Sequence, residues 1–356
     1  MVDIVVNNHN YGRFVGDAVR SALAQTHPRV RVIVVDDGST DDSCERLREF
    51  EPDVGLILKE QGGQASAINA GFAGSTGDIV IFLDADDMLR EAAAAEVAAA
   101  FARDPSVTKV QYRMEVIDAE GRATGAVRPY AHTPLLDGDV SEAELTFPYD
   151  LPWPGMSANA FRSESLRRIL PMPERSDGLG TDQYLVHLTP LLGKVVSLDD
   201  VLGSYRVHGG NMYELQHPTL DLAHVRVSVV VAAATTPQLE QLADELGLAR
   251  RPGPILSVAD LANRLVSMKL EPELHPLPSD RVPRLAIDGI RAAYRRFDIT
   301  WQMKLLLAGW FVLTAVAPRP LARRLASSFL LAETRPRLNR VLRRFHKWNR
   351  PVGTGQ

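Results

Sequence analysis

Three aspartates follow a short apolar run, and their spacing suits the binding of a divalent cation. The run covers residues 79–83, and Asp84, Asp86 and Asp87 come directly after it. A continuous apolar run of this length predicts a strand buried on both faces, as in parallel sheets. Asp84 and Asp86 are two residues apart, so an extended chain would point both to the same side. Carboxylate oxygens placed there suit Mg²⁺ or Mn²⁺ shared with phosphate groups, and a solvated acidic turn is the alternative.

A second strand of the same design ends in a second pair of carboxylates. Residues 32–35 are apolar, Asp36 and Asp37 follow, and Ser39 and Thr40 are residue types that begin helices well. The carboxyl ends of parallel strands meet at one edge of a sheet, where open α/β folds bind their ligands. One acidic strand end could then hold a metal while the other accepts hydrogen bonds from a base or ribose.

Alternating strands and helices must position these carboxylates. We expect strands at residues 2–7, 30–35, 54–59 and 78–83, and helices at 12–24, 41–50, 64–74 and 89–103. Such alternation predicts right-handed crossovers and a doubly wound, mostly parallel α/β sheet. Beyond Pro105 we expect a strand at 107–118, loop at 123–152, helices at 158–170 and 181–192, and a strand pair at 194–198 and 201–206.

Five motifs in order make the chain resemble the family 2 glycosyltransferases over roughly residues 1–212. They are VDIVVNNHNYGRFVGDAVRSALAQTHP, VIVVDDGSTDDS, GGQASAINAGFAGSTGDIVIFLDADD, DGLGTDQYL and YRVHGGN. The resemblance implies a Rossmann-like GT-A fold and an inverting enzyme that uses a nucleotide-diphosphate sugar, most often a UDP-sugar. Five ordered motifs are far more specific than any single short motif.

The resemblance also assigns residues to the sugar-nucleotide donor. Asn7, His9 and Asp37 match positions that meet the base and ribose, and Gln64 and Asn69 lie in the segment that lines the donor site. A buried carboxylate that accepts from a base would discriminate between nucleotides. The alternatives are a surface-loop histidine for His9 and an exposed helix face for Gln64 and Asn69.

The resemblance further implies that Asp86 binds the metal directly and that Asp84 supports the ribose or a metal-bound water. His208 matches a histidine that can complete the shell of the Mn²⁺ or Mg²⁺, although a lone histidine is often structural. Asp182 matches the general base, because an inverting transfer needs a carboxylate that takes the proton from the acceptor hydroxyl. The alternative makes Asp182 the N-cap of a helix at 183–192.

The last third of the chain has a different composition. Residues 213–356 read as a helical extension, in which 299–317 are almost entirely apolar. Residues 319–350 carry ten lysines and arginines against one acid, Glu333, although the whole chain has a net charge of −4. This asymmetry predicts a basic, amphipathic tail on an anionic membrane surface, and a tail packed on the protein is the alternative. No nucleic-acid-binding signature accompanies the arginines, so we expect no nucleic-acid partner.

Together these features predict a metal-dependent inverting glycosyltransferase that extends a glycan or lipid-linked glycan, as in cell-surface polysaccharide synthesis. One cysteine, Cys44, and the lack of a leader before the first expected strand favour a cytoplasmic protein, peripheral on the inner face of the membrane. Trp153 and Met156 lie where the family builds its acceptor pocket, and core packing is their alternative role. A sugar nucleotidyltransferase and a non-catalytic nucleotide-sugar-binding module are the alternative functions.

Overall fold

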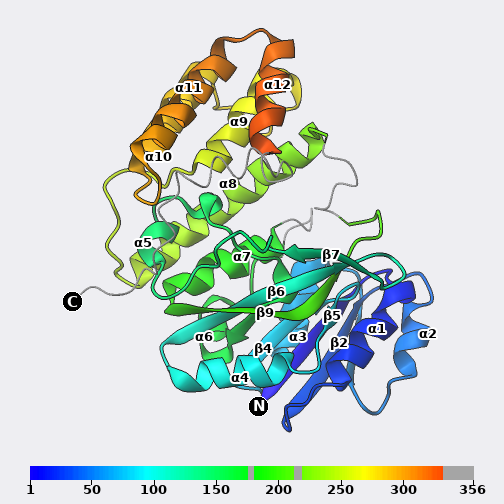
Figure 1. Cartoon of the computed structure of the whole chain (residues 1–356). Helices are drawn as coiled ribbons and strands as arrows, with labels where there is room; N and C mark the ends of the chain where they lie inside the picture. The colour runs from blue at the N-terminus through cyan, green and yellow to red at the C-terminus, as the bar shows by residue number, and fades with distance from the viewer. Residues whose placement is uncertain (175–179, 212–218, 332–356) are drawn as a thin grey trace. The chain divides into compact units, whose positions relative to one another are not determined.

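The computed structural model describes residues 1–174, 180–211 and 219–331, and it divides into two compact units (Figure 1). The first, here the sheet unit, comprises Met1–Val140 and Pro152–Gly210. The second, here the helical unit, comprises Ser141–Leu151 and Asn211–Gln356. The segment 141–151 therefore belongs to the helical unit although it lies within the range 1–212 that we expected to form one domain.

A mixed sheet of nine strands forms the sheet unit. Its strands are β1 (Val2–Asn8), β2 (Val30–Asp37), β3 (Gly55–Lys59), β4 (Ile79–Asp84), β5 (Met88–Leu89), β6 (Val107–Ile117), β7 (Ala123–Arg128), β8 (Asn159–Arg162) and β9 (Lys194–Arg206). The order is β3-β2-β1-β4-β8-β6-β9-β5, with β7 paired to β6. The flanking helices are α1 (Gly12–Leu23), α2 (Ser43–Arg48), α3 (Gln64–Ala73), α4 (Ala93–Arg103), α6 (Ser163–Ile169) and α7 (Thr181–Leu188).

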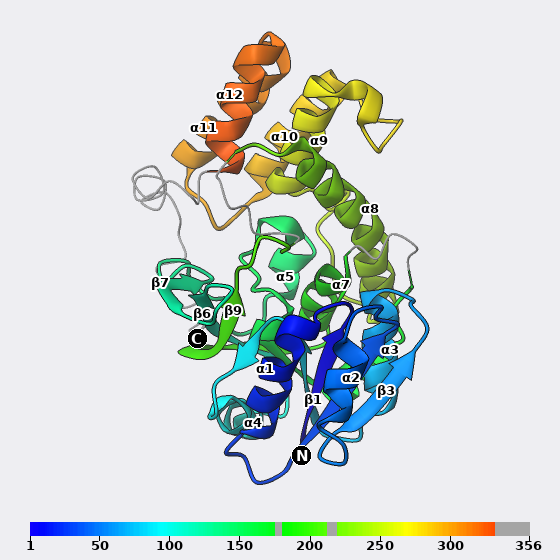
Figure 2. The same ribbon diagram turned by 90° about the vertical axis from the view of Figure 1, so that its right-hand side faces the viewer.

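The first four strands of this order are parallel. Strands β1, β2 and β4 are largely buried, as their apolar runs predicted, whereas the edge strand β3 is partly exposed. Ile4 and Val6 of β1 pack in the core that α1 and α4 cover, whereas Val5 points to the opposite face. There Gly71 lets α3 approach so closely that a Cβ atom at this position would lie 2.3 Å from a methyl carbon of Val5. Helices on both faces confirm the doubly wound α/β design, and Figure 2 shows α1 and α2 in front of β1.

The second half of the sheet differs from the expectation in three places. Residues 123–128 form strand β7 instead of loop, because they pair antiparallel with β6. The segment 158–170 is not one helix, since β8 occupies 159–162 and pairs antiparallel with both β4 and β6. The expected strand pair at 194–206 is one strand, β9, which pairs with β6 in parallel. A short buried strand has the same apolar pattern as a segment of a buried helix, so the sequence did not distinguish strand from helix at β8.

The helical unit contains α5 (Ser141–Glu144), α8 (Leu222–Glu245), α9 (Val258–Leu270), α10 (Val282–Arg295), α11 (Trp301–Val316) and α12 (Arg319–Leu330). The apolar stretch 299–317 of the expected helical extension corresponds to α11. Gly289 of α10 lies against the ring of Phe311, so close that a Cβ atom there would be 2.2 Å from a ring carbon. Together with α9, these two helices enclose an apolar core of the unit.

Within the described ranges, no helix combines the length and the apolar composition that a bilayer span requires. Helix α11 has 16 residues, and about 20 apolar residues are needed to cross a bilayer. The part of the basic tail beyond Leu331, with Trp348, lies outside the described residues.

Candidate active site at the carboxyl edge of the sheet

The polar ends of three parallel strands lie side by side in the sheet unit. Asn7 of β1 stands in register with Asp84 of β4, and Asn8 stands in register with Asp36 of β2. The Nδ2 group of Asn7 donates to Asp84 Oδ1 at 2.9 Å, and that of Asn8 donates to Asp36 Oδ2 at 2.7 Å. The asparagines of the central strand therefore bridge the two acidic strand ends.

Asp84 lies partly buried among a group of carboxylates. Its Oδ1 atom also accepts from the side-chain amide of Gln64 at 3.0 Å, which brings the start of α3 to the same point. Burial raises the pKa of Asp84 well above its ordinary value, and the charges of Asp182, Asp87 and Asp86 raise it further. These four carboxylates, Asp84, Asp86, Asp87 and Asp182, are called the acidic cluster below. Their mutual repulsion makes the cluster a strong site for positive charge.

Asp182 joins this cluster from nearly one hundred residues further along the chain. Gly180 adopts a left-handed conformation, with φ of 86°, directly before α7 begins at Thr181. Asp182 therefore lies in the first turn of α7 and does not cap it. Its Oδ2 atom accepts from the backbone N–H of Met156 at 3.2 Å. Burial raises the pKa of Asp182 to about 6, so the carboxylate is ionised at neutral pH yet is a stronger base than an exposed aspartate.

Asp86 contacts His208, and the resemblance assigned both residues to a metal site. His208 Nε2 and Asp86 Oδ2 are 3.0 Å apart, and both side chains are largely buried. His208 is oriented by two aromatic rings, since its centroid lies 4.8 Å from that of Phe14 and 5.5 Å from that of Tyr11. Burial and the charges of the acidic cluster raise the pKa of Tyr11 to about 12, so this hydroxyl stays protonated beside the cluster.

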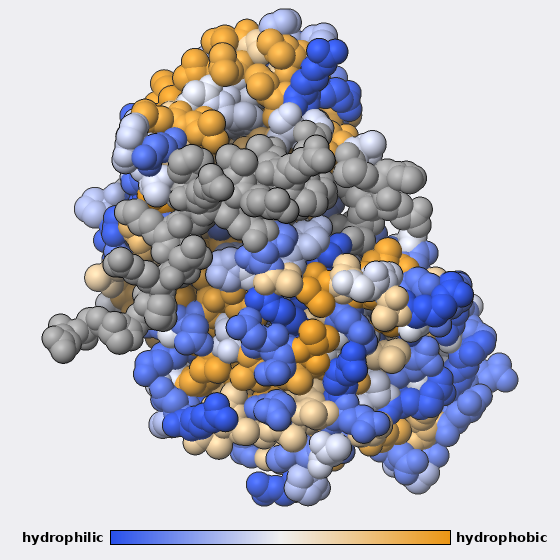
Figure 3. Space-filling model, in the orientation of Figure 1, coloured by the Kyte–Doolittle hydropathy of each residue, from blue (hydrophilic) through white to orange (hydrophobic). Residues whose placement is uncertain are grey.

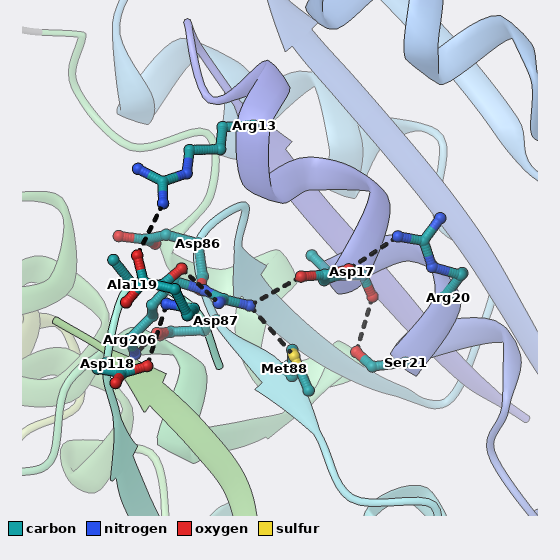
Figure 4. Close-up of polar contacts among 12 residues, drawn as sticks. Arg13, Asp17, Arg20, Ser21, Asp86, Asp87, Met88, Asp118, Ala119 and Arg206 are labelled. Atoms are coloured by element: carbon teal, nitrogen blue, oxygen red, sulfur yellow. Dashed lines mark hydrogen bonds and ion pairs between the residues drawn. The ribbon is translucent and has the colours of Figure 1, made fainter. Parts of the chain in front are cut away.

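Arg206 contacts the backbone and side chains around Asp86 and Asp87 of the acidic cluster (Figure 4). Sequence reasoning assigned it no role. Its guanidinium group donates to the carbonyl oxygen of Asp86 at 2.9 Å, to that of Ala119 at 3.2 Å and to the carboxylate of Asp17 at 3.0 Å. The backbone N–H of Arg206 donates to Asp87 Oδ1 at 3.0 Å. One buried arginine thus fixes the backbone of the loop that presents Asp86. The only sequence signal was its position two residues before His208 in the last motif.

Asp37 and His9 organise the neighbouring turn. The Asp37 carboxylate accepts from the ammonium group of Lys59 at 2.6 Å, from Gly62 N–H at 2.9 Å and from Gly63 N–H at 2.6 Å. His9 Nδ1 lies 2.9 Å from the carbonyl oxygen of Asp37, so this nitrogen carries the proton. The two residues lie together at the β2 end, and their contact with a base or ribose stays a prediction.

Asn69 lies away from these contacts, on the side of α3 that meets residues 172–174. Its amide exchanges two hydrogen bonds of 2.9 Å with the backbone of Met172. This pairing ties α3 to the segment 172–174. Gln64 therefore reaches the acidic cluster, whereas Asn69 holds a loop.

The segment that carries Trp153 and Met156 contacts both the acidic cluster and a buried lysine. The Nζ atom of Lys109, on β6, lies 3.7 Å from the centroid of the Trp153 ring. The Lys109 side chain is fully buried, which makes this a desolvated cation–π contact. Ser157 accepts from the backbone N–H of Asp84 at 3.1 Å. Residues 153–157 thus pack against the expected donor site on one side and Asp182 on the other.

Asp86 and His208 are the candidate metal ligands. No group of three histidine, cysteine or carboxylate side chains arranged for a metal ion occurs among the residues that the structure describes. Mg²⁺ sites commonly use one or two protein ligands and fill the other positions with substrate phosphates and water. One carboxylate and one imidazole 3.0 Å apart fit a site of that kind.

The chain is similar to known glycosyltransferases in sequence and in fold. Residues 3–146 match the model of the family "Glycosyl transferase family 2". An uncharacterized glycosyltransferase of Nostoc sp. is 32% identical over 214 residues, which are 59% of this chain and 66% of the relative. The undecaprenyl-phosphate 4-deoxy-4-formamido-L-arabinose transferase of Pseudomonas savastanoi is 40% identical over 93 residues, 24% of this chain and 28% of that protein. S. aureus TarS, solved with UDP-GlcNAc, has the same fold, with a TM-score of 0.53, 16% identity and coverage of 93% of this chain and 92% of that chain.

Proposed function

Because the chain belongs to glycosyl transferase family 2 and has its GT-A fold, we propose that it transfers a sugar from a nucleotide-diphosphate sugar to a glycan or lipid-linked glycan, with inversion. The observation that carries this proposal is the convergence of Asp84, Asp86 and Asp182 at the carboxyl edge of a parallel sheet. This edge is where α/β folds bind nucleotides, and the three carboxylates divide into a donor-binding pair and a base.

The ends of β1 and β2 would hold the nucleotide. Asp37, saturated by Lys59 and by two glycine N–H groups, keeps the turn at 62–63 in place beside His9. Gly63 has a φ of 86°, which only glycine adopts without strain, so the turn brings backbone rather than side chain toward the ligand. Asn7 and Gln64 fix Asp84, whose free oxygen would face the ribose. A UDP-sugar is the donor we favour.

Asp86 and His208 would hold Mn²⁺ or Mg²⁺. When bound, such an ion would neutralise the diphosphate leaving group as the glycosidic bond of the donor breaks. Arg206 fixes the carbonyl of Asp86, and Phe14 and Tyr11 fix the ring of His208, so both ligands are oriented before the donor arrives. Positive charge placed there would also relieve the repulsion that raises the pKa of Asp84.

Asp182 would be the general base. In one displacement, its carboxylate takes the proton of the acceptor hydroxyl as that oxygen forms a bond to the anomeric carbon and the nucleoside diphosphate leaves. Its raised pKa of about 6 suits proton acceptance near neutral pH. The Met156 N–H keeps one oxygen in place and leaves the other to face the acceptor.

The helical unit would bring the enzyme to the inner surface of the cell membrane. Of the twelve large apolar side chains that are exposed in the described residues, nine lie between Ile287 and Leu321. Figure 3 shows hydrophobic surface gathered over this helical region. Such a concentration is unusual for a surface that faces water, and a lipid-linked acceptor would be met there.

Thermal unfolding of the full chain with a panel of nucleotide-sugars, with and without Mn²⁺, identifies the donor. The stabilising donor is then incubated with enzyme, and free nucleoside diphosphate is measured. We expect one donor to raise the unfolding temperature only with the metal present, and to be turned over. If none of the nucleotide-sugars binds or is cleaved, the proposed function is wrong.

A further inference from the structure

A groove in the helical unit is lined by three arginines. Its walls are one face of α10 and the segment before α9, and its volume is about 490 Å³. The lining residues are Pro254, Leu256, Arg284, Asp288, Arg291, Tyr294 and Arg295. We call this the arginine groove. Its size is in the range of small-ligand sites.

The spacing of the charged residues on α10 produces the groove. Positions 284, 288, 291 and 295 recur every three or four residues, so they form one stripe on the helix. Asp288 accepts from Arg284 at 2.6 Å and from Arg291 at 2.8 Å, which fixes both guanidinium groups along the stripe. Three guanidinium groups against one carboxylate leave the groove with excess positive charge.

Arg295 closes one end of the arginine groove. It donates to the carbonyl oxygen of Pro254 at 2.6 Å. Burial lowers the pKa of Arg295, and the nearby positive charge of Arg251 lowers it further. A phosphate group is the ligand that such planar donors bind best.

An exposed apolar helix face adjoins the arginine groove. We call it the apolar face of α11, and it consists of Trp301, Leu305, Leu306, Val312, Leu313 and Val316, which are 46–73% exposed. The ammonium group of Lys304, on the first turn of α11, donates to the carbonyl oxygen of Tyr294 at 3.0 Å. The end of the groove and the start of the apolar face are thus held together.

We propose that the arginine groove binds the phosphate headgroup of an anionic phospholipid, while the apolar face of α11 lies in the adjoining acyl region. A ligand of this kind matches both surfaces at once, because it joins an anionic phosphate to hydrocarbon chains. Tyr294 and Trp301 stand at the junction, and aromatic side chains of this type favour the interface between headgroups and hydrocarbon. The inference extends the membrane docking proposed above from a general surface to a defined lipid site.

Sedimentation of the full chain with vesicles tests this site. Vesicles of phosphatidylcholine are compared with vesicles that also contain phosphatidylglycerol, and donor turnover is measured separately so that either proposal can fail alone. The variant Arg284→Gln/Arg291→Gln removes two exposed groove arginines. The control Arg167→Gln/Arg168→Gln removes two exposed charges from α6 of the sheet unit.

We expect wild type and control to bind the phosphatidylglycerol vesicles alike. The groove variant should bind about 10–30-fold more weakly, because each of its two lost basic residues contributes about fivefold to the affinity for an anionic leaflet. Leu313→Glu should abolish binding with the groove intact. Equal losses in the groove variant and the control, or equal binding of wild type to both kinds of vesicle, would overturn the headgroup site. So would binding of soluble glycerol phosphate without any binding to vesicles. Thermal unfolding of each variant shows whether it is folded.

Discussion

Arg206→Met tests whether one buried arginine holds the loop of the acidic cluster in place. The Arg206 side chain is 2% exposed, and the substitution would leave the carbonyl oxygens of Asp86 and Ala119 without their donor. Each buried acceptor left unpaired costs about 1 kcal/mol or more. The positive charge beside buried Asp87 and half-exposed Asp17 would be lost as well. We therefore expect the free energy of unfolding to fall by about 3–5 kcal/mol, the usual cost of removing one partner from a buried charge network.

Arg13→Met is the matched control. Arg13 and Arg206 each place the guanidinium carbon 5.0 Å from the centroid of the Phe14 ring, but Arg13 is exposed and pairs with the exposed carboxylate of Glu120. Surface pairs contribute about 1 kcal/mol or less. Urea unfolding followed by tryptophan fluorescence compares the two variants. If Arg206→Met unfolds within about 1 kcal/mol of Arg13→Met, the supporting role of Arg206 is refuted.

Three further predictions follow from the same structure. Asp86→Ala should weaken Mn²⁺-dependent donor binding by more than about tenfold, and Asp84→Ala should weaken it less. Calorimetry with the donor measures both affinities, and equal affinity of Asp86→Ala and wild type would contradict the metal assignment. Turnover should fall as the pH drops through about 6, because protonated Asp182 cannot accept a proton, and a rate that is flat down to about pH 5 would be inconsistent with a base of that pKa. Gly71→Ala should destabilise the protein by about 1–3 kcal/mol, because the new methyl group would lie 2.3 Å from a side-chain carbon of a valine of β1. Gly309→Ala is the control, since a Cβ atom there has open space around it and should not destabilise the protein. Equal unfolding midpoints of the two variants would refute the packing argument.

The parallel half of the sheet could be predicted because its signals are local. The three strands at 2–8, 30–37 and 79–84 are largely apolar and end in polar side chains. A strand of this composition must be buried on both faces, so each is predicted to be an inner strand of the sheet. The juxtaposition of Asn7 with Asp84 follows from parallel register alone. The pairing of His208 with Asp86 was anticipated only through the order of the family motifs.

The remaining features depend on tertiary contacts that the sequence does not encode locally. Strand β8 carries a helix-like pattern and becomes a strand because β4 and β6 both pair with it. In the sequence, Arg206 is indistinguishable from a surface arginine. Its role in holding the Asp86 loop becomes visible only in the folded chain, where it donates to Asp17, Asp86 and Ala119. The arginine groove likewise needs the segment at Pro254, which lies some forty residues before Arg295 in the chain.

Nucleotide release by Asp182→Asn tests the central claim most directly. Asparagine keeps the size of the side chain and removes its ability to accept a proton, while the donor contacts that we propose for Asp84 and Asp86 would be unchanged. With the cognate nucleotide-sugar and Mn²⁺, we predict unchanged donor affinity and a turnover about 10²–10⁴-fold below wild type. A variant that binds the donor and releases nucleoside diphosphate at nearly the wild-type rate would contradict the account.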